Sequence, residues 1–157
     1  MKKSTAFIGA ILSLIPLGKP LLIKTGIVVS SSAVMLNFPE KINAETADFY
    51  FDRAFEKGEN GDYYGAISDF TKAIEINPNY AKAYNNHGWI KAKLKDYYGA
   101  ISLYTKAIEI NPNYALAFAN RGSSKESIGD MKGACDDWRK ASSLGDELSA
   151  KWVRNQC

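Results

Sequence analysis

Residues 71–81 read TKAIEINPNYA, and residues 105–115 repeat that sequence without a single change. A second repeated stretch precedes the first: residues 62–68 read DYYGAIS, and the same seven letters return at residues 96–102. Both pairs are offset by 34 residues. A fixed period of about 20 to 50 residues is typical of repeat proteins, in which one unit cannot bury its apolar face alone and packs against its neighbours. The sequence therefore predicts an array of stacked units.

Large and small residues recur at fixed positions in three successive units, residues 47–80, 81–114 and 115–148. In the second unit, Tyr84 and Gly88 are four residues apart, so they share one face of a first helix. Ala100, Tyr104 and Ala107 follow in steps of four and three, which predicts an apolar stripe on a second helix. We expect Gly88 to let the two helices approach closely, with the Tyr104 ring beside it. The counterparts are Tyr50, Ala54, Ala66, Phe70 and Ala73 in the first unit, and Phe118, Gly122, Ala134, Trp138 and Ala141 in the third.

Start and stop signals divide each unit into two helices. Asp62, Asp96 and Asp130 stand where each second helix should begin, and aspartate is a good N-cap because it accepts hydrogen bonds from free backbone N–H groups. Asn-Pro pairs at residues 77–78 and 111–112 should end the second helices, since the residue before proline avoids the helical region.

The third unit ends differently. Leu144-Gly145 replaces the Asn-Pro pair, and Gly145 can adopt the left-handed conformation of a helix C-cap. A seventh helix is expected over residues 146–156, with Leu148 and Trp152 as an apolar pair that covers the last unit.

This pattern resembles the tetratricopeptide repeat family, whose units are pairs of antiparallel helices with a period of 34 residues and a closing proline, here Pro78 and Pro112. The resemblance covers residues 47–148. It implies an all-α fold, a right-handed α-α superhelix of three helical hairpins plus a C-terminal capping helix, over a domain at residues 45–157. It also implies a non-catalytic module or adaptor that binds a peptide or helical segment of another protein.

The same resemblance implies that the first helices line a concave groove. The stripe facing away from the second helices is Asp48, Phe51, Phe55, Gly58 and Glu59, then Lys82, Asn85, Trp89, Ala92 and Lys93, then Leu116, Ala119, Ser123, Glu126 and Ser127. From this stripe and its flanks we take Phe51, Phe55, Lys82, Asn85, Asn86, Trp89 and Asn120 as candidate partner-binding residues. The aromatic rings would take apolar side chains, and the amides would bond a peptide backbone. The alternative is that Phe51, Phe55 and Trp89 serve packing, Phe51 against the segment near Ile42.

Some members of the family hold a C-terminal carboxylate with a clamp of Lys, Asn, Asn, Lys and Arg. The corresponding positions here hold Phe51, Phe55, Asn86, Leu116 and Asn120. Only Asn86 matches, so a clamp of this kind is not expected.

Residues 1–44 differ in composition from the rest and form a predicted leader. Lys2 and Lys3 precede the apolar run 6–15, prolines and a glycine interrupt it at residues 16–20, and a second apolar run covers residues 27–38. Small-residue cleavage sites occur at residues 42–44 and 31–33. The leader is longer than the usual signal peptide of about 15–30 residues, and neither run reaches the roughly 20 residues that a membrane span needs.

The composition of the leader predicts either an export signal, to the periplasm or a lumen, or a membrane anchor that contacts the membrane through residues 6–38. A transit peptide is a further alternative. A buried N-terminal helix is the least favoured alternative. The chain resembles small bacterial tetratricopeptide proteins with such a leader, many of which act as assembly or scaffolding factors.

The net charge of +3 belongs to the leader. Its four lysines precede the first acidic residue, Glu40, and from residue 40 onward there are 16 Lys and Arg against 17 Asp and Glu. The repeats thus have no general attraction for nucleic acid, and their charges should be interspersed.

No motif for catalysis, metal or cofactor binding is present in the sequence. His87 is the single histidine, at the position that Arg53 and Arg121 hold in the other units, and we expect a charged or amphipathic rim residue. Neither an enzyme activity, a cofactor nor a metal is expected. Two alternatives to the binding module remain: a self-associating structural scaffold, and an accessory subunit of an envelope enzyme complex.

Cys135 and Cys157 are the only cysteines. An antiparallel pair of helices that turns near Gly145 would bring them together. They form either one disulfide, favoured if the leader exports the protein to an oxidising compartment, or two free thiols.

Overall fold

The computed structural model describes residues 46–157, so the predicted leader at residues 1–44 lies outside the described residues. The described part is all-α, as predicted, and contains no strand. Its helices are α3 (Ala47–Glu59), α4 (Tyr63–Ile76), α5 (Ala81–Lys93), α6 (Tyr97–Ile110), α7 (Ala115–Ser127), α8 (Met131–Ser143) and α9 (Glu147–Gln156).

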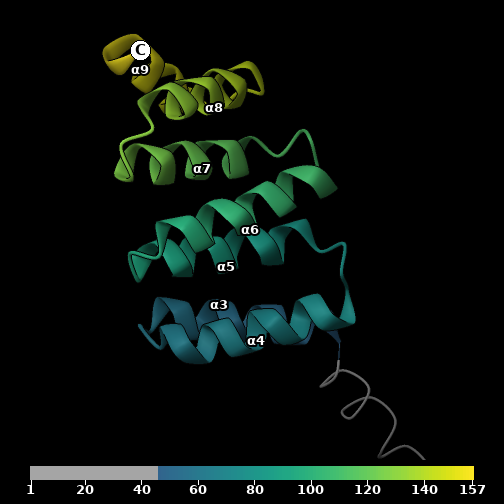
Figure 1. Ribbon diagram of the computed structural model, residues 1–157. Helices are drawn as coiled ribbons and strands as arrows, with labels where there is room; N and C mark the ends of the chain where they lie inside the picture. Colours follow the sequence, from purple (N-terminus) through teal and green to yellow (C-terminus); the bar gives the residue numbers. More distant parts are fainter. Residues whose placement is uncertain (1–45) are drawn as a thin grey trace, which may run out of the picture. The chain divides into compact units, whose positions relative to one another are not determined.

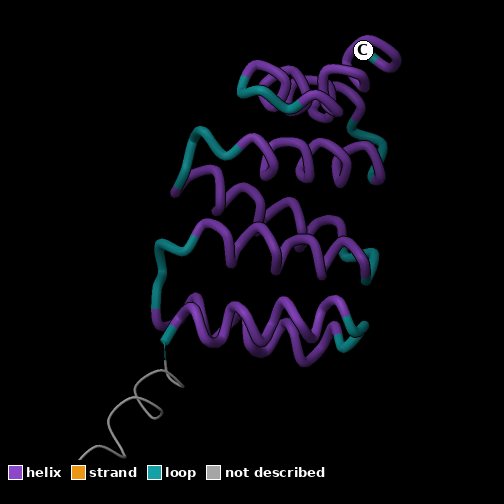
Figure 2. The backbone as a smooth tube through the Cα atoms, turned by 180° about the vertical axis from the view of Figure 1, so that it is seen from behind, coloured by secondary structure: helices purple, strands orange, loops and turns teal. Residues whose placement is uncertain are grey.

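The helices form three hairpins and a cap. Helices α3 and α4, α5 and α6, and α7 and α8 pack as pairs, and the hairpins stack in chain order through contacts of α4 with α5 and of α6 with α7 (Figure 1). The first helices also contact each other, α3 with α5 and α5 with α7, so they line one side of the stack, and α9 packs on α8 (Figure 2). This arrangement confirms the predicted fold class.

The helix boundaries follow the capping signals in the sequence. The Asp62 side chain accepts a hydrogen bond from the backbone N–H of Gly65 at 2.9 Å, and Asp96 and Asp130 do the same for Gly99 and Gly133 at 3.0 and 2.9 Å. Helices α4 and α6 stop at the residue before each Asn-Pro pair. The starts of all three second helices, and the ends of α4 and α6, therefore coincide with signals in the local sequence.

Close contact between the helices of a hairpin depends on a small residue in the first helix. A Cβ atom added to Gly88 of α5 would lie 2.8 Å from Cε1 of Tyr104, which is buried on α6. Gly122 stands in the same relation to Trp138 in the next hairpin. In the first hairpin, Ala54 is fully buried and fills the corresponding position. The predicted packing of a small residue against a ring is thus confirmed.

Two buried carboxylates join the helices of the first and third hairpins. Arg53 and Lys57 of α3 both pair with Asp69 of α4, the lysine Nζ at 2.8 Å. The hydrogen bond from Arg53 lowers the pKa of the Asp69 carboxyl below its usual range. In the third hairpin, 68 residues later, Asp137 occupies the position of Asp69 and the same arrangement recurs. Neither cluster was predicted from the sequence.

In the third hairpin, Arg121 Nε and Nη2 donate to Asp137 at 2.8 and 2.6 Å, and Lys125 Nζ lies 2.8 Å from the same carboxylate. Arg121 also donates to Thr105 Oγ1 of α6 at 3.0 Å, which ties this hairpin to the one before it.

The middle hairpin lacks such a cluster, because His87 and Leu103 occupy the positions of the arginine and the aspartate. The His87 ring stacks on Phe70 of the first hairpin, with centroids 6.3 Å apart, and neither buried ring nitrogen has a hydrogen-bond partner. Burial, with a further contribution from the nearby Lys91 charge, lowers the pKa of His87 to about 4. The expected charge is therefore absent at neutral pH: the imidazole is neutral, partly buried and stacked on Phe70, where the other hairpins have an arginine.

Helix α9 covers the end of the last hairpin. Trp152 packs on Trp138, with ring centroids 5.3 Å apart. The predicted partner of Trp152, Leu148, does not share this role, because its side chain is 58% exposed. Ser149 lies at the buried position instead, so the packed face of α9 is centred on residues 149 and 152, which are three residues apart rather than four.

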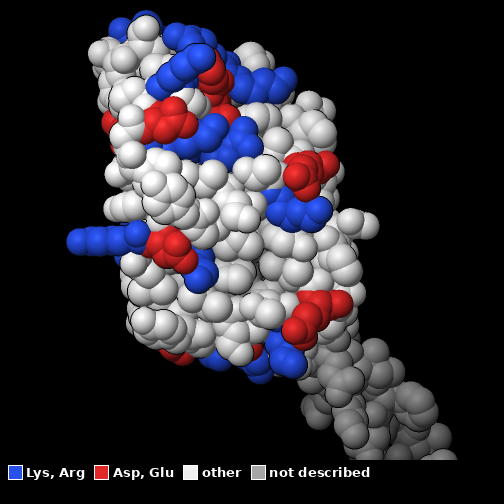
Figure 3. Space-filling model, viewed as in Figure 1, with Lys and Arg blue, Asp and Glu red and all other residues white. Residues whose placement is uncertain are grey.

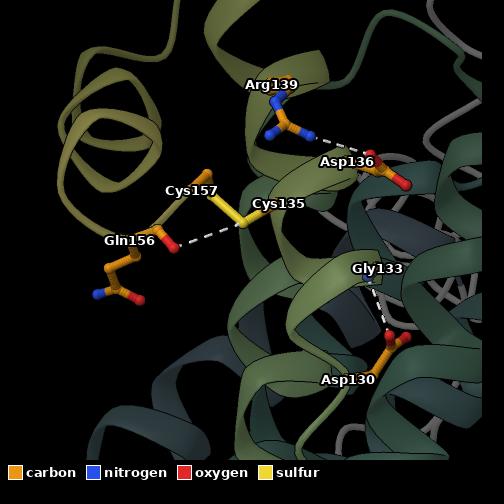
Figure 4. Close-up of a disulfide and its surroundings, with 7 residues drawn as sticks. All are labelled: Asp130, Gly133, Cys135, Asp136, Arg139, Gln156 and Cys157. Carbon is orange, nitrogen blue, oxygen red and sulfur yellow. Dashed lines mark hydrogen bonds and ion pairs between the residues drawn. A yellow bond between two sulfur atoms is a disulfide. The ribbon is translucent and has the colours of Figure 1, made fainter.

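A disulfide joins Cys135 of α8 to Cys157, with Cα atoms 5.7 Å apart (Figure 4). The bond fixes the end of α9 to the start of α8. Gly145, in the turn between these helices, has a φ of +97°, the left-handed conformation expected of it.

Lysine and arginine side chains lie among aspartate and glutamate side chains on the face shown in Figure 3. Within residues 46–157, no helix has both the length and the apolar character that crossing a membrane requires.

Candidate functional site

A groove of about 230 Å³ crosses the side of the stack that the first helices form. Its lining comes from three hairpins: Phe55 and Glu59 of α3, Asn85, Asn86 and Trp89 of α5, and Leu116 and Asn120 of α7. A ligand in this groove would contact every repeat at once.

The apolar part of the groove contains two large side chains that are about half exposed. Phe55 is 51% exposed and Leu116 is 47% exposed. Trp89 is half-buried, because part of its ring packs against the core of the first hairpin. The Lys93 ammonium lies 5.0 Å from the centroid of the Trp89 ring, a distance at which a cation is attracted to the ring face. The groove thus offers apolar surface from three different helices.

The polar part of the groove is made of amides. Asn85 is 1% exposed, and its Oδ1 accepts a hydrogen bond from Asn120 Nδ2 at 3.1 Å. This bond connects α5 to α7 beneath the groove and holds the Asn120 side chain in place. Asn86 is half-exposed beside it. Asn86 and Asn120 both line the groove, and their amides have further donor and acceptor capacity that a peptide backbone could use.

The candidate residues from the sequence divide into two groups. Five of them line the groove: Phe55, Asn85, Asn86, Trp89 and Asn120. Phe51 does not; it packs within the first hairpin, with ring centroids 5.8 Å from Phe70 and 5.1 Å from Tyr80. Lys82 is exposed and also lies outside the lining. Asn85 differs from its expected role, since the buried bond to Asn120 makes it a support for the groove rather than a contact for a ligand.

Glu59 and Leu116 line the groove but were not among the candidates. Both belong to the stripe of groove-facing positions, so the signal for them was already in the helical spacing. Residue type does not single them out, because neither an exposed glutamate nor an exposed leucine carries a chemical signature of its own.

Among residues 46–157, no cluster of histidine, cysteine and acidic side chains could hold a metal ion.

Comparison with known proteins agrees with the repeat pattern. Residues 47–80 and residues 81–114 each match a sequence model of the tetratricopeptide repeat. These two segments are tetratricopeptide repeats. Among curated proteins, none matches the chain.

Solved structures with tetratricopeptide repeats have the same fold. The first such domain of Spaghetti (RPAP3), bound to the HSP90 peptide SRMEEVD, is 21% identical and aligns with a TM-score of 0.66 over 69% of this chain and 87% of that one. The Arabidopsis OM64 domain is 24% identical, with a TM-score of 0.67 over 73% of this chain and 99% of that one. The second RPAP3 domain, bound to the same peptide, is 26% identical, with a TM-score of 0.62 over 66% of this chain and 95% of that one.

Proposed function

We propose that the repeat domain is a non-catalytic protein-interaction module that binds a segment of a partner protein in the groove of its first helices. The observation that carries the proposal is the exposed apolar surface of Phe55 and Leu116, which borders amides supported from below. Large apolar side chains that stay exposed in a concave site gain free energy when a partner covers them. The two RPAP3 domains, which were solved with a peptide bound, support this role by analogy of fold.

Peptide display tests the proposal without a known partner. The full-length protein, immobilised, is used to select peptides from a random library, and the selected peptides are then measured by titration calorimetry. We expect Phe55→Ser and Leu116→Ser each to weaken binding about tenfold, because each removes apolar surface that the peptide would cover. The effect on folding should be small, since both side chains are about half exposed in the unbound protein.

Tyr64→Ser and Tyr98→Ser are the matched controls. Both tyrosines are highly exposed aromatic residues, and both lie on second helices outside the groove. Equal loss of binding in the groove variants and in these controls would contradict the proposed site, and failure to select any peptide would contradict the proposed function.

Self-association is a second candidate, because α3 has an outer face that the other first helices do not expose. Phe49 is 37% exposed, whereas Ala83 and Ala117 at the same repeat position are fully buried by the preceding second helix. Sedimentation velocity over a hundredfold concentration range tests this candidate. A dimer that Phe49→Ala abolishes would support it, and a monomer at every concentration would exclude it.

For the leader at residues 1–44, export or membrane attachment stays a proposal. The disulfide between Cys135 and Cys157 supports export, since such bonds persist in oxidising compartments. N-terminal sequencing of the natural product distinguishes a cleaved signal, which would leave a new end near residue 45, from an uncleaved anchor.

A further inference from the structure

The charge of the groove indicates what kind of segment it accepts. Glu59 is the single ionisable side chain among the lining residues, and no lysine or arginine lines the groove. Within the described part of the chain, Glu59 takes part in no ion pair, although α3 forms two others. Lys93 is the nearest cation that the contacts identify, and its ammonium lies over the Trp89 ring. A carboxylate in the groove would therefore meet the like charge of Glu59, and the nearest identified cation, Lys93, is engaged by the Trp89 ring.

The peptide bound to the RPAP3 domains is acidic overall. Its sequence, SRMEEVD, contains two glutamates and one aspartate against one arginine. In the present groove, Leu116 and Asn120 occupy the two lining positions at which the carboxylate clamp described above has Lys and Arg. An acidic segment that enters would lose hydration of its carboxylates without gaining an ion pair to a lining residue, which costs free energy.

A segment with an apolar side chain and a cation would find a partner for each. The apolar side chain would cover Phe55, Trp89 and Leu116, and a neighbouring lysine or arginine would reach the Glu59 carboxylate at the end of α3. Asn86 and Asn120 could bond its backbone amides, which need no terminal group. Opposite charges at the rim of a site mainly add selectivity and a faster association rate.

We propose that the groove binds an internal, extended segment of its partner in which an apolar residue stands next to a lysine or arginine, and that it discriminates against acidic segments. This inference rests on the proposed function, because it assumes that the groove is the binding site.

Selection from one random display library tests the inference, with three forms of the full-length protein: wild type, Glu59→Lys and Glu56→Lys. Glu56 is a matched control because it is an exposed glutamate on the same helix and does not line the groove. We expect wild type and Glu56→Lys to select peptides enriched in lysine or arginine beside an apolar residue. Glu59→Lys should instead select peptides enriched in aspartate or glutamate.

Synthetic peptides then give the size of the effect. The peptide that binds wild type most tightly, blocked at both ends, is measured by calorimetry at 0.15 M salt. It should bind Glu59→Lys about tenfold more weakly than wild type, a loss of roughly 1.4 kcal/mol in binding free energy. Its affinity for Glu56→Lys should stay within about twofold of that for wild type. Equal binding of the free-acid and amidated forms would confirm that the chain end is not recognised.

The outcomes separate the inference from the proposed function. Acidic peptides selected by wild type, or the same peptide composition from wild type and Glu59→Lys, would overturn the charge preference and leave a binding groove. Peptides that bind Phe55→Ser/Leu116→Ser as tightly as wild type, or no selected peptides at all, would overturn both.

Discussion

Gly88 shows how one atom limits the spacing of two helices. Its missing Cβ leaves the space into which the edge of the Tyr104 ring packs, at a distance that no real Cβ could keep. The same substitution elsewhere in a helix would be favourable, because alanine is the better helix former. At Gly88, the steric conflict with the Tyr104 ring outweighs this gain in helix propensity.

Gly88→Ala should lower the free energy of unfolding by about 2 kcal/mol, as overfilling a packed core does. Urea unfolding followed by circular dichroism measures the change. Ser68→Ala, on the exposed face of α4, is the control and should stay within about 0.5 kcal/mol of wild type. A neutral or stabilising Gly88→Ala would mean that α5 and α6 can separate without cost.

The lowered pKa of His87 makes the free energy of unfolding depend on pH in the mildly acidic range. The pKa of His87 is about 4 in the folded protein, whereas the ordinary value for histidine is 6.5, so between these values the unfolded chain holds a proton that the folded chain does not. The unfolded state binds more protons there, and stability rises with pH. The neutral ring's full contribution is present above pH 6.5 and falls progressively as the pH drops towards 4.

His87→Gln should remove this dependence. Unfolding curves at pH 7.5 and pH 5 should show a larger loss of stability for wild type than for the variant, because only the wild type has an imidazole that must become charged in place. Identical losses would show that other groups, such as the carboxylates, cause the acid sensitivity.

The buried carboxylates of the first and third hairpins connect the first helix of each hairpin to the second through ion pairs. Asp137 is almost fully buried and is surrounded by Arg121 and Lys125. Its neighbour Asp136 is exposed and pairs only with Arg139 of the same helix, as the close-up in Figure 4 shows. The two adjacent aspartates thus have the same chemistry and very different surroundings.

Asp137→Asn should cost about 3 kcal/mol of stability, because it leaves two poorly solvated cations without their carboxylate. Asp136→Asn should cost less than about 0.5 kcal/mol, since exposed ion pairs contribute little. Chemical denaturation of both variants makes the comparison. Similar effects of the two changes would show that the buried cluster adds no net stability.

The disulfide holds α9 in place on the last hairpin. It closes a loop with a sequence separation of 22 residues, and in the chain-entropy description such a closure stabilises the folded state by about 3 kcal/mol. The double variant Cys135→Ala/Cys157→Ala should have a free energy of unfolding about 3 kcal/mol lower than that of wild type. Its backbone amides should exchange faster in α9 than in α7. A reductant should reproduce the effect in wild type and leave the double variant unchanged. Unaltered exchange in α9 would indicate that the Trp138–Trp152 contact holds the helix without the bond.

Across the repeat domain, the features that recur in the sequence were predictable, and the features that depend on a partner distant in the sequence were not. The Asp62 and Asp96 caps and the stops before proline repeat with the period, so they gave the elements and their ends. The hairpin pairing followed from the Gly88 and Tyr104 positions. The ion pairs of Asp69 and Asp137 were missed, because their partners lie on another helix and no local spacing indicates them.

Prediction of the groove from the sequence was limited in the same way. Helical spacing identified the side of the stack on which it lies, but it could not separate Phe51 from Phe55, which are one turn apart on α3. Phe51 faces Phe70 and Tyr80, and Phe55 faces outward. Which of the two rings is covered depends on contacts with residues distant in the sequence, here Phe70 and Tyr80, and the spacing within α3 does not show them.

The distribution of indole rings gives the protein two separate optical reporters. Trp89 borders the groove, whereas Trp138 and Trp152 contact each other beneath the terminal helix. A Trp89→Phe variant would emit only from the terminal pair, and subtracting its spectrum from that of wild type would isolate the emission of the groove. Occupancy of the groove and detachment of α9 could then be followed in one cuvette without any attached dye.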